Sequence, residues 1–169
     1  MSLETEMALL LSGGAVCTDL LWNKVPNNWI FLGFCTGLSC RVFRFGLRGS
    51  FLFLEGMLIP FFLLFPFFFF RMIGAGDIKL LSVLGGFLGK AEIWGALFCI
   101  FLMGAILSGA FLVTCGNFLE RFRYFADYIR EICTEHKIVP YGKTGMHVEN
   151  MHFTVPILLG LMLHVGGVC

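Results

Sequence analysis

The most constraining feature of the sequence is an apolar stretch that ends in FFLLFPFFFF. It runs from Phe51 to Phe70 and contains a single charged residue, Glu55. A helix needs about 20 predominantly apolar residues to cross the hydrocarbon core of a bilayer. The rest of the chain agrees, since 58% of its 169 residues are hydrophobic, 14% are charged and 21 are phenylalanines. A soluble domain is typically about 25% charged, so the composition predicts an all-α, polytopic membrane protein.

Six apolar segments are expected to form helices, which gives about six transmembrane helices in a single membrane-embedded domain, residues 1–169. The second and fourth segments are short for a span. No Lys or Arg precedes the first segment, so we expect a retained helix rather than a removable signal peptide. The expected segments are Met7–Leu21, Asn28–Cys40, Phe51–Phe70, Ile78–Gly89, Ile93–Cys115 and Phe153–Val168.

One long polar segment, residues 117–150, separates the last two of these segments. Its apolar residues recur at helical spacing, which predicts an amphipathic helix lying at the membrane interface with its charged face in water. These residues are Phe118, Phe122, Phe125, Ile129 and Ile132.

The basic residues bias the orientation of the chain in the membrane. With the N-terminus outside, eight of the twelve Lys and Arg residues fall in cytoplasmic loops, as the positive-inside rule favours. The cluster Arg41, Arg44 and Arg48 would then lie outside, against that rule. In either orientation Asp19 and Asp77 share a side, because two crossings separate them.

Several functional classes are disfavoured. A net charge of +1 without a basic stripe gives no support for nucleic-acid binding. GAGDIK lacks the third glycine of a dinucleotide fingerprint, and YGKTG lacks the first glycine of a phosphate loop. The four histidines have no metal-ligand spacing, and the seven cysteines form no C-x-x-C pair, so free thiols are expected. We therefore expect neither a metal nor a cofactor.

Two aspartates adjoin the membrane segments, Asp19 and Asp77. A carboxylate beside an apolar segment is costly and implies either a partner or a function. If both carboxyl groups face one wet pocket, they cannot both ionise comfortably, so one holds a proton while the other accepts one from water. Such a pair can activate water for attack on a peptide carbonyl without a metal. Gly74 and Gly76 would let a substrate backbone approach Asp77.

Two other readings of these acids stay open at this point. An aspartate at a helix end is often an interfacial cap or a partner of the helix dipole. Alternatively, a non-enzymatic membrane component, such as a secretion scaffold or a small transporter, would use the two acids to handle ions or protons.

The sequence resembles the type IV prepilin peptidases, which are membrane aspartic proteases with a GxGD motif. GAGDIKLLSVLGGFLG is similar to that motif around Asp77. Asp19 is followed by LLWNK and then by Val25-Pro26-Asn27, as in the first motif of the family. The later FTVPILLG, with Pro156 and Gly160, is similar to the pattern of the last helix.

The resemblance implies that Asp19 and Asp77 are the catalytic pair. It implies that Gly74, Ala75 and Gly76 shape the substrate-binding loop that presents Asp77, and that Lys79 is either a substrate-binding residue or a membrane anchor. Pro26 and Asn27 would turn the chain into the second helix, which Asn27 or Asn28 can cap through its side chain.

The implied reaction is removal of the short leader of prepilin-like precursors, after a glycine, on the cytoplasmic side of the bacterial inner membrane. The implied partners are these precursors and the lipid bilayer, and the oligomeric state is left open. The chain has no zinc-binding cytoplasmic domain, so it resembles the short, peptidase-only members that serve Flp/Tad-type pili. We expect no methyltransferase activity.

Overall fold

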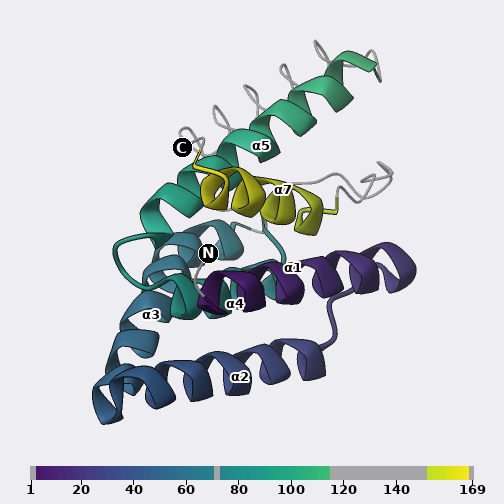
Figure 1. Cartoon of the computed structure of the whole chain (residues 1–169). Helices are drawn as coiled ribbons and strands as arrows, with labels where there is room; N and C mark the ends of the chain where they lie inside the picture. The colour runs from purple at the N-terminus through teal and green to yellow at the C-terminus, as the bar shows by residue number, and fades with distance from the viewer. Residues whose placement is uncertain (1–2, 71–72, 115–151, 168–169) are drawn as a thin grey trace, which may run out of the picture.

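The computed structural model describes residues 3–70, 73–114 and 152–167, with the side chains of 112–114 excepted. Within these ranges the chain forms helices and no strand, which confirms the all-α prediction (Figure 1). The helices are α1 (Leu3–Trp22), α2 (Asn27–Phe45), α3 (Leu47–Phe69), α4 (Ala75–Leu88), α5 (Ile93–Thr114) and α7 (Thr154–Val165).

The short helix α4 is the centre of the packing. It contacts α1, α2, α3 and α5, and every residue from Leu80 to Leu88 is buried. A helix that is apolar all round has no face to offer to water, so it becomes stable only when neighbours cover each side. The helix that looked too short to be a simple span is therefore the one around which the others pack.

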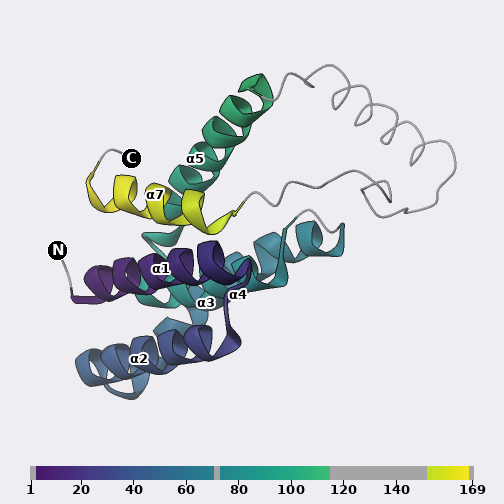
Figure 2. The ribbon, with the colours of Figure 1, turned by 90° about the vertical axis from the view of Figure 1, so that its right-hand side faces the viewer.

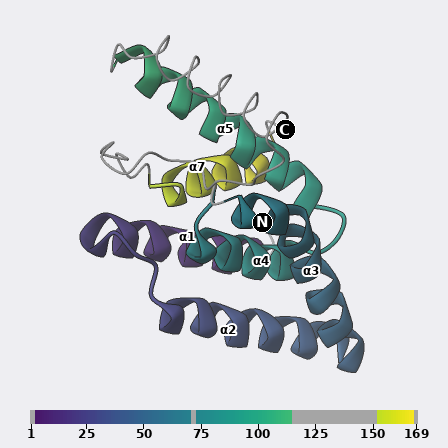
Figure 3. The ribbon, with the colours of Figure 1, turned by 180° about the vertical axis from the view of Figure 1, so that it is seen from behind.

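The last described helix lies beside the first. Helix α7 contacts α1 and α5, and Figures 1 and 2 both show it between these two helices, with α2 on the far side of α1 and α4. The view from behind shows the same order (Figure 3). This topology brings the start of α7 to the end of α1 that carries Asp19.

Glycines allow the closest helix contacts. A Cβ atom added to Gly56 of α3 would meet the carbonyl oxygen of Gly85 in α4, and one added to Gly160 of α7 would meet the backbone of Ile100 in α5. Small residues at such points let two backbones approach, which is how helices gain packing contacts in lipid.

Two described helices are long and apolar enough to cross a membrane by length and composition, over residues 47–69 and 93–111. Most exposed side chains of α3 are Phe or Leu, as a lipid-facing surface requires. The other expected spans stay predictions. The expected amphipathic helix in residues 117–150 lies outside the described residues.

The second helix is longer than the sequence suggested. The expected segment was Asn28–Cys40, whereas α2 continues to Phe45. The residues that suggested a loop are Arg41 and Arg44. Arg41 is buried and donates from Nη2 to the carbonyl oxygen of Phe87 at 2.7 Å. Its side chain therefore links α2 to α4 instead of lying in a loop.

Candidate active site

Asp19 lies in the last turn of α1, next to the point where the chain reverses. The helix ends at Trp22 because Asn23 adopts a left-handed conformation, with φ of 51°. The backbone N–H of Asn23 donates to the carbonyl oxygen of Asp19 at 2.7 Å. Asparagine is one of the few residues that tolerate this conformation, which commonly terminates helices.

The Val25-Pro26-Asn27 motif connects α1 to α2 and lies next to the start of α4, which carries Asp77. Pro26 is extended, with φ of −67° and ψ of 139°, and α2 begins directly after it, as expected. Val25 is buried and faces Gly76, where an added Cβ atom would lie 3.9 Å from the Cβ atom of Val25. The motif therefore packs against the first turn of α4, which carries the second acid.

The expected side-chain cap of α2 is wrong, because the helix start carries no side-chain cap hydrogen bond. The side chain of Asn27 has another partner, since its Oδ1 atom accepts a hydrogen bond from Nζ of Lys79 at 3.1 Å. Lys79 thus ties α4 to the start of α2. Its expected substrate role stays a prediction.

Asp77 lies in the first turn of α4 and caps that helix. Gly74 is the N-cap residue, and the Asp77 carboxylate accepts a hydrogen bond from its backbone N–H. This is the half of a capping box in which the third helical residue reaches back to the N-cap. A Cβ atom on residue 74 would lie 3.1 Å from Oδ2 of Asp77, so glycine leaves room for the carboxylate. Ala75 is exposed.

The two acids interact. Asp77 precedes the apolar run Ile78–Gly89 and lies outside the two helices that are long enough to span a membrane. Burial, and then the charge of nearby Asp19, raise the pKa of Asp77 to about 6, against the opposing hydrogen bond from Gly74. The structure thus brings together the two aspartates that the sequence singled out, close enough for the charge of Asp19 to favour the protonated form of Asp77.

Thr154, the first residue of α7, and His152, two positions before it, complete the surroundings of Asp19. The hydroxyl of Thr154 donates to Oδ2 of Asp19 at 2.7 Å, and Nδ1 of His152 lies 3.1 Å from the same oxygen. Sequence reasoning missed both residues. The available signal was the pair of polar residues in HFT at the edge of the last apolar segment, since polar groups in such positions need partners.

The described residues offer no metal site. Within them, no group of three or more His, Cys, Asp and Glu side chains could hold a metal ion, and Cys17, Cys35 and Cys40 are free thiols. The side chains that meet at the candidate site are the two carboxyl groups, Thr154 and His152.

Comparison with known proteins identifies the family. The model of the type IV leader peptidase family matches residues 7–113, a span that contains both aspartates and the Val-Pro-Asn turn between them. No curated protein and no solved structure gives a significant match. The match covers more than half of the chain, and the chain therefore belongs to the type IV leader peptidase family.

Proposed function

We propose that this chain is a membrane aspartic endopeptidase that removes the short leader from type IV prepilin-like precursors. Membership of the family supports a peptidase, and the two long apolar helices support a place in a membrane. Cleavage after a glycine, on the cytoplasmic side and by a pair of aspartates, is part of the proposal.

The observation that carries the proposal is that Asp19 lies close enough for its charge to help raise the pKa of Asp77. The two acids come from different helices and different motifs. Asp19 accepts a hydrogen bond from Thr154, and Asp77 accepts one from the backbone of Gly74. A pair in which one carboxyl group is ionised and the other protonated matches the needs of water attack on a peptide bond. One member takes a proton from water, and the other gives a proton to the carbonyl oxygen.

A groove that reaches the starts of α2 and α4 suits the apolar helix that follows the leader. It lies between α2, α3 and α4, has a volume of about 370 Å³, and is lined mainly by apolar side chains that include Phe31, Phe34 and Phe61. Asn27 and Lys79 also line it, and Lys79 is close in sequence to Asp77. We place the start of the mature precursor in this groove, with the leader directed toward water.

The test is leader removal from a co-expressed precursor with a basic leader, a glycine and an apolar helix. Asp19→Asn and Asp77→Asn should each reduce cleavage by about 100-fold or more, because each removes a group that must gain or lose a proton. Glu55→Gln is the matched control, since it neutralises a carboxylate that pairs with Lys90 on the surface. The product is identified by its mass and new N-terminus. Normal cleavage by either Asp variant would exclude the pair.

A further inference from the structure

We propose that Thr154 and His152 are positioning residues that keep Asp19 as the ionised, proton-accepting member of the pair. Asp77 is then the member that carries the proton and donates it. This assignment rests on the proposed peptidase function and deepens it, because it gives each aspartate a separate role.

Asp19 has two polar side chains at one of its carboxylate oxygens, whereas Asp77 accepts a hydrogen bond from the backbone of Gly74. Thr154 is fully buried and His152 is partly buried, and both meet the same oxygen, Oδ2 of Asp19. An ionised carboxylate only accepts hydrogen bonds, so Oδ2 of Asp19 can accept from the Thr154 hydroxyl and from Nδ1 of His152 in the tautomer that carries a proton there. A proton on that oxygen would have to displace one of them. Hydrogen bonds that favour the charged form keep an acid ionised.

Asp77 has less support for a negative charge. It accepts the backbone N–H of Gly74 and lies partly buried beside the charge of Asp19. Lys79, the nearest cation in the sequence, is engaged with Asn27. The proton shared by the pair therefore belongs on Asp77.

The titratable neighbours of Asp19 come from two parts of the chain. Helix α4 contributes Asp77, and the residues just before α7 contribute His152, which is charged only when it is protonated. The basic residues of α2 lie elsewhere, since Arg41 and Arg44 both pair with Glu4 at the opposite end of α1. The side chains near Asp19 are thus Asp77, Thr154 and His152.

The step that follows balances its protons. A water molecule gives one proton to Oδ1 of Asp19 while its oxygen bonds to the scissile carbonyl carbon, and Asp77 gives its proton to the carbonyl oxygen. A neutral gem-diol results. When it collapses, the C–N bond breaks, the proton on Asp19 moves to the leaving amine, and a gem-diol proton returns to Asp77.

The experiment compares paired variants of the full chain in lipid nanodiscs. Thr154→Val removes the donor at nearly constant volume, whereas Thr154→Ser keeps it. His152→Phe removes the ring donor, whereas His152→Asn keeps an N–H at the same branch point. The readouts are kcat, KM and the pH profile of leader cleavage.

We expect Thr154→Val to lower kcat by about 10- to 100-fold with KM nearly unchanged, because a hydrogen bond to a charged group is lost. The acid limb of the profile should move to higher pH, since the ionised form of Asp19 loses a donor. Thr154→Ser keeps the hydroxyl donor, so its kcat and the acid limb of its pH profile should stay close to those of the wild type. Equal effects of Val and Ser, or an unmoved acid limb, would overturn the assignment even if the chain is a peptidase.

An infrared titration makes the assignment testable without turnover. At about pH 5 the spectrum should lose a protonated carboxyl band in Asp77→Asn and an ionised carboxylate band in Asp19→Asn. The reverse pattern would overturn the inference. A wild-type chain that shows the expected bands but cleaves no precursor would instead refute the proposed function.

Discussion

Opposing effects act on the protonation of Asp77. Its position at the helix start and the N–H of Gly74 favour the carboxylate, while burial and Asp19 favour the acid form. The balance lies with the acid form, which raises the pKa of Asp77 from 3.8 to about 6. A residue kept in this state for chemistry should weaken the fold at neutral pH.

The consequence is a pH-dependent stability with a definite sign. Between pH 3.8 and about 6 the folded chain binds more protons at Asp77 than the unfolded chain does, so the free energy of unfolding falls as pH rises through this window. Asp77→Asn removes the ionisation and keeps an oxygen for Gly74. We therefore expect this variant to melt at a higher temperature than wild type above pH 6 and to match it near pH 4.

Thermal unfolding in detergent at a series of pH values measures this difference. Glu55→Gln is again the control, because Glu55 is exposed on α3 and binds Lys90. A lower melting temperature for Asp77→Asn above pH 6 would show that the charged form of Asp77 is stabilised in the fold.

The sequence could predict the two acids but not their hydrogen-bond partners. Asp19 and Asp77 stand out because an acid beside an apolar segment is costly. His152 and Thr154 reach Asp19 across 133 and 135 positions, and no local pattern encodes such a contact. The side chain of Asn27 was expected to cap α2 because the alternative partner, Lys79, is likewise remote in sequence.

At the level of elements, the contact between α3 and α4 is the tightest constraint on the site. Gly56 and Gly85 face each other so closely that a Cβ atom on either would meet the carbonyl oxygen of the other. Since α4 carries Asp77, any separation of these helices also moves the acid. The packing of two glycines is thus linked to the geometry of the active site.

Replacing Gly56 with Ala should therefore destabilise the chain by about 1–3 kcal/mol, as overpacking of a close contact does. We expect reduced peptidase activity as well, because α4 must shift. Gly109→Ala is the matched control, since an added Cβ atom there meets nothing within 4 Å and Ala is the better helix former. Thermal unfolding and cleavage rates check both variants. Equal behaviour of the two would mean that α3 and α4 separate without cost.

The periodic and apolar segments predicted the helices well, with errors at their ends. Each of the six expected segments corresponds to a described helix. The largest error is at the end of α2, where the basic residues of RVFRF were assigned to a loop. Burial of Arg41 against Glu4 and Phe87 explains the difference, because a paired and hydrogen-bonded charge can continue a buried helix.

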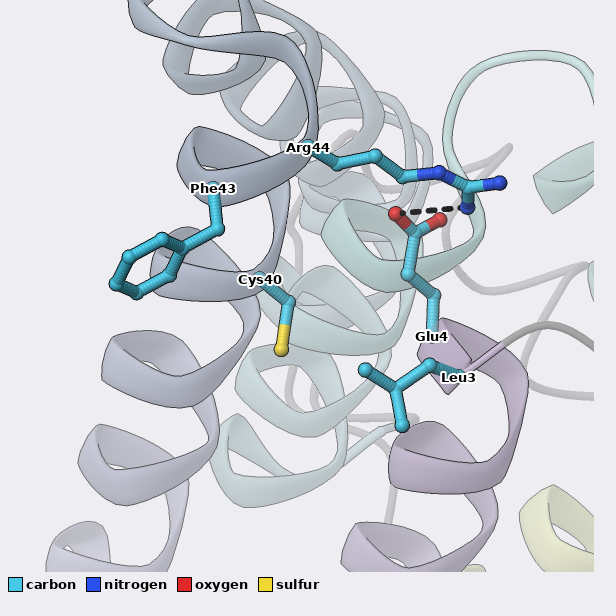
Figure 4. A pocket seen from close by; sticks show the side chains of 5 residues that line it. All are labelled: Leu3, Glu4, Cys40, Phe43 and Arg44. Carbon is cyan, nitrogen blue, oxygen red and sulfur yellow. Dashed lines mark ion pairs between the residues drawn. The ribbon is translucent and has the colours of Figure 1, made fainter.

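On the scale of the whole molecule, α1 makes polar side-chain contacts at each end. Asp19 meets α7 and α4 at one end, and Glu4 meets α2 at the other (Figure 4). Oε2 of Glu4 lies 3.4 Å from Nη2 of Arg41, and Oε1 lies 3.4 Å from Nη1 of Arg44. A pocket of about 530 Å³ adjoins this second cluster.

The two arginines should differ in importance although they share Glu4. The Arg41 side chain is 10% exposed and that of Arg44 is 57% exposed. Arg41→Met leaves Glu4 buried without its inner partner and removes the donor to Phe87, so we expect a loss of about 3–5 kcal/mol in the free energy of unfolding. Arg44→Met should cost about 1 kcal/mol or less, as for exposed pairs.

Chemical unfolding in detergent compares the two variants. A double-mutant cycle then uses Arg41→Met, Glu4→Gln and the variant that combines them. The double variant should lose less than the sum of the single losses, because neutral Gln no longer leaves a buried charge unpaired. Additive losses would mean that Arg41 acts through Phe87 alone.

The contact between Asp19 and α7 has a consequence for the making of the protein. A ribosome completes α1 and α4 long before it reaches His152 and Thr154, which are 133 and 135 residues beyond Asp19. Until then the growing chain holds both acids without the donors that divide their roles. If Thr154 and His152 set the ionised state of Asp19, the nascent chain has no peptidase activity while its other helices are still being inserted. Activity then begins when α7 packs against α1.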